Sequence, residues 1–369
     1  MIEYEHPKDK RITEVKIRLG TFTPLWTGGI RPNMDRLHET GIIGSLRWWY
    51  EAIVRGLGHY ACDPTSGKEE SPCSTCQLFG CTGLKRKFSL SIKPNGNVGD
   101  EDSNLNIRPH GRNRGWFISP GFSGDMTIHL YGKKKEITQI AFLVHWLSQW
   151  GSIGAKSQLG YGVFEVLETL PPIEPLTLDL LNVNSGKNQP GGLPDLRAFT
   201  FFKFHFVPHS ENWWKTIRHY QSLIKDTKKS QILGNLAKKN MVPVSPLLKD
   251  YFRFKKEWKS FKITKWLFGT IERGRKEKSR VSFSWAYRVG DHWEVRGWAW
   301  LPYWSKSRNL YREAVNGLKN TLGDETDWLK AMDLQGKVSK ARVYIEPGES
   351  PWGIKDTDTI MKWLKGGIA

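Results

Sequence analysis

The sequence lacks a long apolar run anywhere in its 369 residues, which limits the environments it can occupy. No segment approaches the roughly 18 consecutive apolar residues needed to cross a membrane. The first residues, MIEYEHPKDKRITEV, do not contain the apolar core of a secretory signal peptide. We therefore expect a soluble protein of the cytoplasm. A chain of this length typically forms about two domains, each able to bury a core.

Acidic residues are scarce relative to basic ones. The chain contains 37 Asp and Glu against 56 Lys and Arg, a formal charge of +19. Most of this surplus lies in residues 201–290, where 21 Lys or Arg face six Asp or Glu. Because like charges repel, the surplus favours an anionic partner, usually nucleic acid; a basic protein without such a partner is the alternative. Some of the 18 Trp could stack on unpaired bases, although we expect most in the cores.

Cysteine is also rare, and all four cysteines lie within 20 residues. Cys62, Cys73, Cys76 and Cys81 have the spacing C-x10-C-x2-C-x4-C, and four thiolates complete a tetrahedral zinc site. Disulfide bonds are disfavoured in the cytoplasm, and a redox Cys-x-x-Cys pair would not need Cys62 or Cys81. We predict structural Zn2+, because four sulfur ligands leave no position for a reactive water.

The first half alternates strand and helix patterns. Apolar residues alternate along 13–19 as in a half-buried strand, and they recur at helical spacing along 42–57. The pattern then predicts a strand at 88–92, a polar exposed loop at 93–115, a strand at 126–131, a helix at 136–150 and a strand at 163–170. The order strand, helix, strand, strand, helix, strand is that of a ferredoxin-like domain.

A linker rich in Pro, Gly and Asn, 171–197, separates a first domain at 1–170 from a second at 198–369. Along the second domain the sequence predicts a strand at 198–206, a helix at 211–225, a hairpin at 281–301 that turns at Gly290 and Asp291, and a helix at 307–321. The last 45 residues give no clear pattern.

A short motif occurs in both halves. Gln77-Leu78-Phe79-Gly80 and Trp266-Leu267-Phe268-Gly269 each precede a basic stretch and a strand with alternating Ser. This repeat favours duplicated domains. We predict an α+β fold of two tandem ferredoxin-like (RRM-like) domains with a zinc-stapled insertion.

A glycine-rich segment, GSIGAKSQLGYG (151–162), follows the helix at 136–150. It fails the P-loop pattern because Ala155 stands where that motif has Gly, so a nucleotide triphosphatase is disfavoured. We expect its backbone N–H groups and Lys156 to contact an RNA backbone, since Gly lets the main chain approach phosphate closely. A tight connection without a ligand is the alternative.

These residues resemble the RAMP superfamily of CRISPR systems. The resemblance is carried by the GAKSQLGYG loop, by LFG…SRVSFS at 267–284, by TPLWTGG at 23–29 and by TGIIGSLRWWYEAIVRGLG at 40–58, with CDP at 62–64. The N-terminal motifs are similar to the subunit 1 family of the Cmr complex, the type III-B RNA-targeting effector. The resemblance implies a non-catalytic RNA-binding subunit at the head of the complex, at the 3′ region of the guide RNA or on the target RNA. Its partners would be other Cmr subunits, especially subunit 6 and the repeated backbone subunit.

RNA-binding side chains are predicted at basic or polar positions of both halves, and each of them could instead be a solvated surface residue. Binding would be mostly to phosphates and so depend on salt. The predicted residues are Lys156, Gln158 and Tyr161 of the glycine-rich loop, Arg47 of the first helix, Lys85, Arg86 and Lys87, their counterparts Arg273, Arg275, Lys276 and Arg280, and Arg112 and Arg114.

The main rival is a metal-independent, RNA-processing endoribonuclease of the same superfamily, which needs a general base or acid, commonly His. His38, just before the first helix, is the candidate. The chain has no HD or GGDD motif, and it has no acidic partner for the glycine-rich loop. A ribosomal or RNA-modifying protein ranks lower, because the aromatic RNP motif of an RRM is missing.

Overall fold

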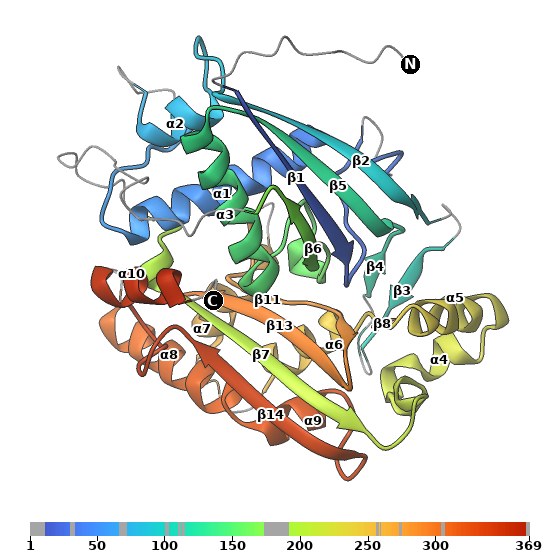
Figure 1. The fold of residues 1–369 in the computed structure, drawn as a ribbon. Coiled ribbons are helices and arrows are strands. Elements are labelled where there is room, and N and C mark those ends of the chain that lie inside the picture. Colours follow the sequence, from blue (N-terminus) through green and yellow to red (C-terminus); the bar gives the residue numbers. More distant parts are fainter. Residues whose placement is uncertain are drawn as a thin grey trace.

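The structure is a computed structural model. It describes residues 12–29, 34–65, 72–99, 103–109, 112, 115–172, 192–255, 258, 260–272, 275–303 and 307–366. Antiparallel sheets flanked by helices confirm the predicted α+β class (Figure 1). Within the described ranges, no helix combines the length and the apolar character that a membrane span requires.

The first half builds a four-stranded sheet in the order β2-β5-β1-β6. Side chains point alternately to the two faces of a strand, so Val15, Ile17 and Leu19 of β1 meet the core that helices α1 and α3 cover. The elements are β1 Thr13–Thr21, α1 Glu39–Gly56, α2 Ser74–Phe79, β2 Phe88–Val98, β5 Phe122–Gly132, α3 Lys134–Trp150 and β6 Phe164–Leu170. The strands and helices predicted for this half are confirmed.

Among its described residues, the segment 93–115, predicted as an exposed loop, is in part strand and in part buried. Strand β2 continues to Val98, and β3 Leu105–Ile107 pairs with β4 Trp116–Ile118. Leu105 and Ile107 are fully buried, and they belong to the core of the second half. The apolar residues at 105 and 107 provide the reason, since burying them outweighs the polarity of their neighbours.

The second half builds a larger antiparallel sheet in the order β14-β7-β13-β12-β8, with β11 also paired to β13. The strands are β7 Phe199–Pro208, β8 Met241–Val242, β11 Val281–Phe283, β12 Ala286–Val289, β13 His292–Trp300 and β14 Val338–Glu346. A separate hairpin pairs β9 Thr270–Glu272 with β10 Arg275–Glu277. The helices are α4 Gln221–Ile224, α5 Thr227–Lys238, α6 Ser245–Arg253, α7 Phe261–Phe268, α8 Arg308–Leu322, α9 Glu325–Ala331 and α10 Thr357–Gly366.

The helix predicted at 211–225 is wrong in part. Two 3-10 turns and the short α4 occupy this segment, because Ile217 is extended (φ −68°, ψ 117°) and interrupts the helical path. This irregular path buries Trp213, Trp214 and Ile217 in the second core, and the burial of their apolar surface stabilises it. The hairpin turning at Gly290 and the helix near 307–321 are confirmed.

The two halves share a core. Phe199, Phe201 and Trp298 of the second sheet pack against Trp49 of α1 and Trp146 of α3. The second sheet therefore covers α1 and α3 from below in Figure 1, and α10 closes the side of the same interface. This aromatic contact accounts for many of the tryptophans as packing residues.

Candidate nucleic-acid interface and cysteine cluster

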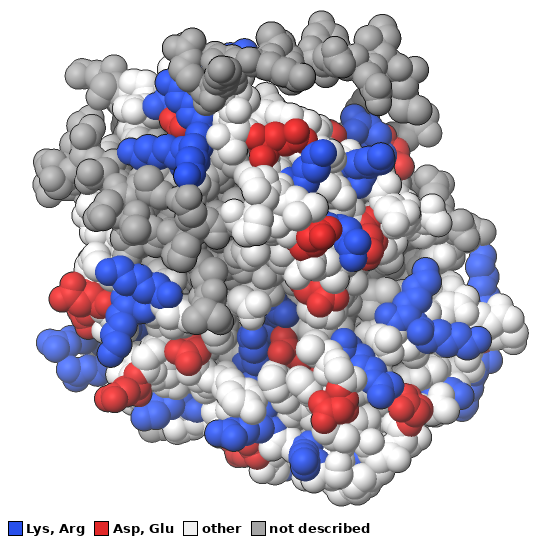
Figure 2. All heavy atoms as spheres, viewed as in Figure 1, with Lys and Arg blue, Asp and Glu red and all other residues white. Residues whose placement is uncertain are grey.

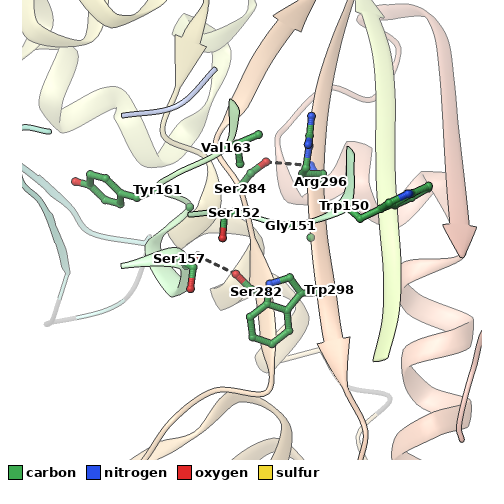
Figure 3. Close-up of a pocket in the computed structure, with 12 residues that line it drawn as sticks. Trp150, Gly151, Ser152, Ser157, Tyr161, Val163, Ser282, Ser284, Arg296 and Trp298 are labelled. Atoms are coloured by element: carbon green, nitrogen blue, oxygen red, sulfur yellow. Dashed lines mark hydrogen bonds between the residues drawn. The ribbon is translucent and has the colours of Figure 1, made fainter. Parts of the chain in front are cut away.

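The glycine-rich loop between α3 and β6 runs into the second half (Figure 3). Gly160 has φ +88°, and a Cβ there would lie 2.5 Å from Cδ1 of Trp285. At Gly162 (φ +83°) a Cβ would lie 2.0 Å from the carbonyl oxygen of Ile153. Glycine is required at both positions because protein atoms, rather than a phosphate, approach the main chain this closely.

The polar groups of the loop bind the second half. Ser282 donates its hydroxyl to the Ser157 carbonyl at 2.8 Å, and the Trp285 indole donates to the Leu159 carbonyl at 2.8 Å. The Gln158 amide donates to the Ser279 carbonyl at 3.1 Å. The ammonium of Lys249 lies 3.1 Å from the carbonyl oxygen of Gln158, and burial lowers the pKa of Lys249 to about 7. The loop is therefore a joint between the halves.

Two predicted RNA contacts of this loop have different surroundings. Tyr161 is fully buried, its hydroxyl donates to the Ser119 carbonyl at 2.5 Å, and burial raises its pKa. It exposes no surface to RNA in this structure. Lys156 is half-buried, with Nζ 3.2 Å from Oγ of Ser119 and 3.9 Å from the centre of the Trp26 ring. Burial lowers the pKa of Lys156, and the loop's cationic charge resides in this side chain.

Arg47 faces the cysteines instead of solvent. Its guanidinium donates to Oε1 of Glu51 at 2.9 Å, to the Gly80 carbonyl at 2.6 Å and to Sγ of Cys76 at 3.2 Å. A side chain with this many internal partners serves to position α2 against α1. No direct RNA contact is needed to explain it.

The other predicted basic residues divide by exposure. Lys85 and Lys87 are exposed, whereas Arg86 donates to the Phe88 carbonyl at 3.0 Å. Arg280 donates to the Trp266 carbonyl at 2.6 Å. The predicted set also includes Arg112, Arg114 and three residues at the β9–β10 hairpin: Arg273, Arg275 and Lys276. Arg112 binds Asp250 at 3.1 Å, while Arg114, Arg273 and the side chains of Arg275 and Lys276 lie outside the described residues.

Figure 2 shows how charge is distributed over one face. Lys and Arg side chains occur over both halves there, and Asp and Glu lie among them, so this face carries no continuous basic band. A nucleic-acid interface on such a surface has to be located by local geometry. Net charge alone does not locate it.

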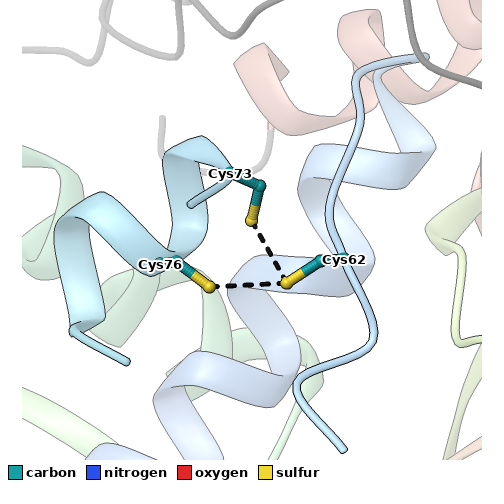
Figure 4. A group of neighbouring side chains, drawn as sticks. All are labelled: Cys62, Cys73 and Cys76. Atoms are coloured by element: carbon teal, nitrogen blue, oxygen red, sulfur yellow. Dashed lines mark hydrogen bonds between the residues drawn. The ribbon is translucent and has the colours of Figure 1, made fainter. Parts of the chain in front are cut away.

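Three of the four cysteines meet where α1, the segment after it and α2 converge (Figure 4). Sγ of Cys62 lies 3.4 Å from Sγ of Cys76 and 3.5 Å from Sγ of Cys73. Burial raises the pKa of Cys76; for Cys73, burial acts in the same direction, but hydrogen bonds from the backbone of Cys62 and Cys76 lower its pKa overall. Cys81 packs against this group but remains outside the set whose sulfurs all lie within 4.8 Å.

The cluster fits a structural zinc ion in donor type and spacing. Tetrahedral Zn–S bonds of about 2.3 Å separate neighbouring sulfurs by about 3.8 Å, a few tenths of an ångström more than the distances here. Cys62, Cys73 and Cys76 would hold the ion, and Cys81, which packs against them, is the fourth thiolate that the spacing predicts. The bound ion would supply cross-linking of the segment 62–81.

His38, the candidate base of the rival nuclease, hydrogen-bonds through Nε2 to Oδ1 of Asp35 at 2.7 Å. Its backbone N–H donates to Oγ1 of Thr27 at 3.0 Å, at the start of α1. This geometry accounts for His38 as a residue that fixes the entry to the helix. The nuclease remains a prediction that the structure does not test.

Comparison with known proteins covers part of the chain. Residues 18–165 match the family model described as the RAMP superfamily. This segment is therefore similar to the RAMP superfamily. It contains the glycine-rich loop and the cysteine cluster, so the resemblance predicted from the sequence is confirmed for these residues. No curated protein matches the sequence.

Solved structures resemble the chain more distantly. The structure titled "Crystal structure of Cmr1 from Pyrococcus furiosus (apo form)" is 16% identical over 79% of this chain and 89% of that one, with TM-score 0.43. Two chains of the type III-B Cmr-beta complex bound to cognate target RNA are 15% and 11% identical. They match over 44% and 84% of this chain and 61% and 99% of theirs, with TM-scores 0.28 and 0.37. The second of these titles adds AMPPnP and single-stranded DNA.

Outside residues 18–165, the second sheet carries a polar cluster that the sequence pattern did not single out. Glu294, almost fully buried, accepts hydrogen bonds from Nε of Arg296 at 3.0 Å and from the Tyr287 hydroxyl. Arg296 also donates to the Ser148 carbonyl of α3 at 2.5 Å. The signal was present in the strand WEVRGWAW, where Glu and Arg alternate with apolar residues.

His205, His292 and Glu294 of this cluster lie close enough to hold a metal ion. Their geometry is that of a hydrogen bond, however, since Nε2 of His205 is 2.7 Å from Oε2 of Glu294. Ligands about 2.0 Å from a tetrahedral ion would lie about 3.3 Å apart. The adjacent buried Arg296 also opposes a second cation.

Proposed function

We propose that this protein is a non-catalytic, RNA-binding RAMP subunit at the head of a type III-B (Cmr) CRISPR complex. It would contact the 3′ region of the guide RNA, the target RNA, or both, in the cytoplasm. The observation that carries the proposal is the RAMP match of residues 18–165, joined in one chain to the basic surplus of residues 201–290.

We further propose that the chain consists of two tandem ferredoxin-like domains, 1–170 and 198–369, connected by 171–197. Strand order supports this division. Counted along the chain, β6-β1-β5-β2 run fourth, first, third, second. In the other sheet the order is β14-β7-β13, and β11 and β12 both pair with β13. If β11 and β12 together count as the second strand, this order is again fourth, first, third, second. Equal order in two sheets is expected of a duplicated unit.

The proposed RNA-binding surface is built from the predicted basic side chains of both halves. These include Lys85 and Lys87, which are exposed, and Lys156 at the joint between the halves. Arg112, Arg114, Arg273, Arg275, Lys276 and Arg280 remain candidates as well. Because such contacts are mostly to phosphates, affinity should fall steeply as salt rises.

The absence of bond-breaking chemistry is part of the proposal. Polar groups of the glycine-rich loop bind the second half, as the contacts of Ser157 and Gln158 illustrate. A loop used in this way has few groups left to act on a phosphate. Target cleavage would then belong to the repeated backbone subunit, and subunit 6 would be a neighbour.

Co-purification tests the function directly. We expect the tagged chain, purified from its source cells at low salt, to bring down untagged RAMP subunits and an RNA of uniform length. Recovery of the chain alone, free of RNA, would contradict the proposal. Incubation of the purified chain with repeat RNA in EDTA tests the nuclease: specific cuts that disappear in His38→Ala would establish the rival function instead.

A further inference from the structure

Beyond Phe201 and Trp298, which pack against the first half, the same face of the second sheet carries a row of aromatic and basic side chains across three strands. Alternate residues of a strand share a face, and the register pairs Tyr344 of β14 with Lys203 of β7, and Arg342 with His205. Phe202, Phe204 and Phe206 of β7 point to the opposite face, into the core. The outward residues are called the sheet platform below, and they are Lys203, His205, His292, Lys340, Arg342 and Tyr344.

Rings of the sheet platform contact one another across the strands. The centroids of the His292 and His205 rings are 4.3 Å apart, and those of His205 and Tyr344 are 4.7 Å apart. The Arg342 guanidinium lies 5.0 Å from the centre of the Tyr344 ring. Tyr344 is 38% exposed at the edge strand, so part of its ring remains open to a ligand.

The charge of the sheet platform is positive. Lys340 and Arg342 are exposed, and the ammonium of Lys203 lies 4.5 Å over the Trp150 ring with a pKa that burial lowers to about 8. Glu294 lies on the same face, opposite His205, and it is buried and paired with Arg296 and His205. Asp291 supplies an acidic group at the rim, where it hydrogen-bonds Nδ1 of His292 at 3.1 Å.

Aromatic rings on an open antiparallel sheet, flanked by flexible cations, are suited to single-stranded RNA: bases stack on the rings and cations meet the phosphates. A protein partner fits less well, since lysine is depleted in protein interfaces and the platform includes Lys203 and the exposed Lys340. We propose that the sheet platform binds unpaired RNA, with a base stacked on Tyr344 beside His205 and phosphates at Lys340 and Arg342. This inference rests on the proposed RNA-binding function.

Binding of a short fluorescein-labelled oligoadenylate to the full chain, followed by anisotropy at low salt, tests the stacking. We expect Tyr344→Ala to weaken binding about tenfold, the loss of one stacked base. Tyr344→Phe keeps the ring and should bind like the unaltered chain. Tyr303→Ala removes another exposed tyrosine, 55% exposed, which contacts Tyr311 away from the platform; it should leave affinity unchanged.

Two further measurements distinguish the contribution of the bases to affinity from that of the phosphates. An abasic oligonucleotide of the same length should bind the unaltered chain and Tyr344→Ala equally. Arg342→Ala, which truncates an exposed side chain and leaves the core intact, should reduce the slope of log affinity against log salt by about one. Arg312→Ala, an exposed arginine of α8, should leave that slope unchanged.

The outcomes distinguish the two proposals. If the unaltered chain binds RNA and both Tyr344→Ala and Arg342→Ala bind equally well, the sheet platform is overturned while the proposed function stands. No RNA binding by the unaltered chain overturns both. Loss of co-purifying protein subunits with unchanged RNA affinity would make this face a protein interface and overturn the inference. Equal melting temperatures for Arg342→Ala and the unaltered chain exclude misfolding as the cause of a changed slope.

Discussion

The two Leu-Phe-Gly motifs form the same corner of the backbone in the two halves. Helices α2 and α7 both end at a glycine with positive φ, +84° at Gly80 and +75° at Gly269. The chain then returns to bond the helix: the N–H of Lys87 donates to the Leu78 carbonyl at 3.0 Å, and the N–H of Arg280 to the Leu267 carbonyl at 2.7 Å.

An arginine fixes each corner, yet what lies behind the corner differs. In the first half, Arg47 bonds the Gly80 carbonyl and the sulfur of Cys76. In the second half, Arg280 bonds the Trp266 carbonyl, and its guanidinium lies 5.1 Å from the centre of the Trp266 ring and 5.6 Å from that of the Trp300 ring. The first corner packs against the cysteine sulfurs, and the second packs against tryptophan rings. The same turn can thus be stabilised by a cross-link or by apolar burial.

The largest expected effect comes from removing the sulfur support. Helix α2 has six residues, too few to be stable alone, so we expect chelation of zinc, or Cys76→Ser, to destabilise the first half by about 4–5 kcal/mol. Hydrogen exchange monitored by mass spectrometry should show lost protection in α2 and unchanged protection in α7. Metal content of the purified chain should be one zinc per chain.

Cys81→Ser serves as the graded comparison for this prediction. If Cys81 is the fourth ligand, this variant should weaken metal binding and alter the thiolate absorption of the cobalt-substituted protein, as Cys76→Ser does. If metal binding is unaffected, three thiols suffice with another ligand. A chain that contains no metal and ignores chelators would show that the thiols only pack together.

A smaller effect should separate the two glycines. A Cβ at Gly269 would lie 2.3 Å from the Glu277 carbonyl oxygen, whereas at Gly80 the nearest atoms lie 3.0 Å away. We expect Gly269→Ala to destabilise the protein by about 3 kcal/mol, from the clash added to the strain of positive φ. Gly80→Ala should cost about 1–2 kcal/mol. Urea-unfolding midpoints measure both.

Gly83 is the matched control for the glycine comparison. Its φ is +78°, and no atom lies within 4 Å of a Cβ built there. Gly83→Ala therefore measures the cost of positive φ alone, about 1 kcal/mol. Equal losses for Gly269→Ala and Gly83→Ala would mean that the second corner relaxes around a methyl group.

Features of the fold that depend on neighbours in sequence were predictable. The alternation at Val15, Ile17 and Leu19 defines β1, and helical spacing of apolar residues defines α1 and α3. The turn at Gly290 follows from local backbone preference. The grouping of Cys62, Cys73 and Cys76 was likewise predicted from their spacing, because residues close in sequence can come together without contacts from distant parts of the chain.

Features that depend on distant partners were not predictable in this way. The glycines of the loop suggested a phosphate, but Trp285, more than 120 positions later in the chain, is what approaches Gly160. Tyr161 was predicted to contact RNA, but residues of the second half bury it. The sequence around Tyr161 does not show that burial. Strand β14 lies in the last 45 residues, where the sequence has no clear pattern, and its pairing with β7 is what places it in the sheet.

Acid should weaken an ion pair of the second half. Glu294 is buried beside Arg296. Burial alone would raise the pKa of Glu294, but the charges of Arg296 and Lys203 and the hydrogen bond from His205 hold it well below its ordinary value of 4.5. A lowered folded-state pKa stabilises the protein above pH 4.5, and that stability is lost as pH falls below 4.5.

We expect the difference in unfolding free energy between the unaltered chain and Glu294→Gln to shrink by about 2 kcal/mol from pH 4.5 to pH 3. Glutamine cannot titrate. Because both proteins contain the same cysteine cluster, any effect of acid on that cluster cancels when the two unfolding free energies are subtracted. Glu313→Gln, at an exposed position of α8, should show no such trend. A difference that stays constant with pH would mean that Glu294 is protonated alike in the folded and unfolded chains, and its pairing with Arg296 would then not stabilise the joint at Ser148.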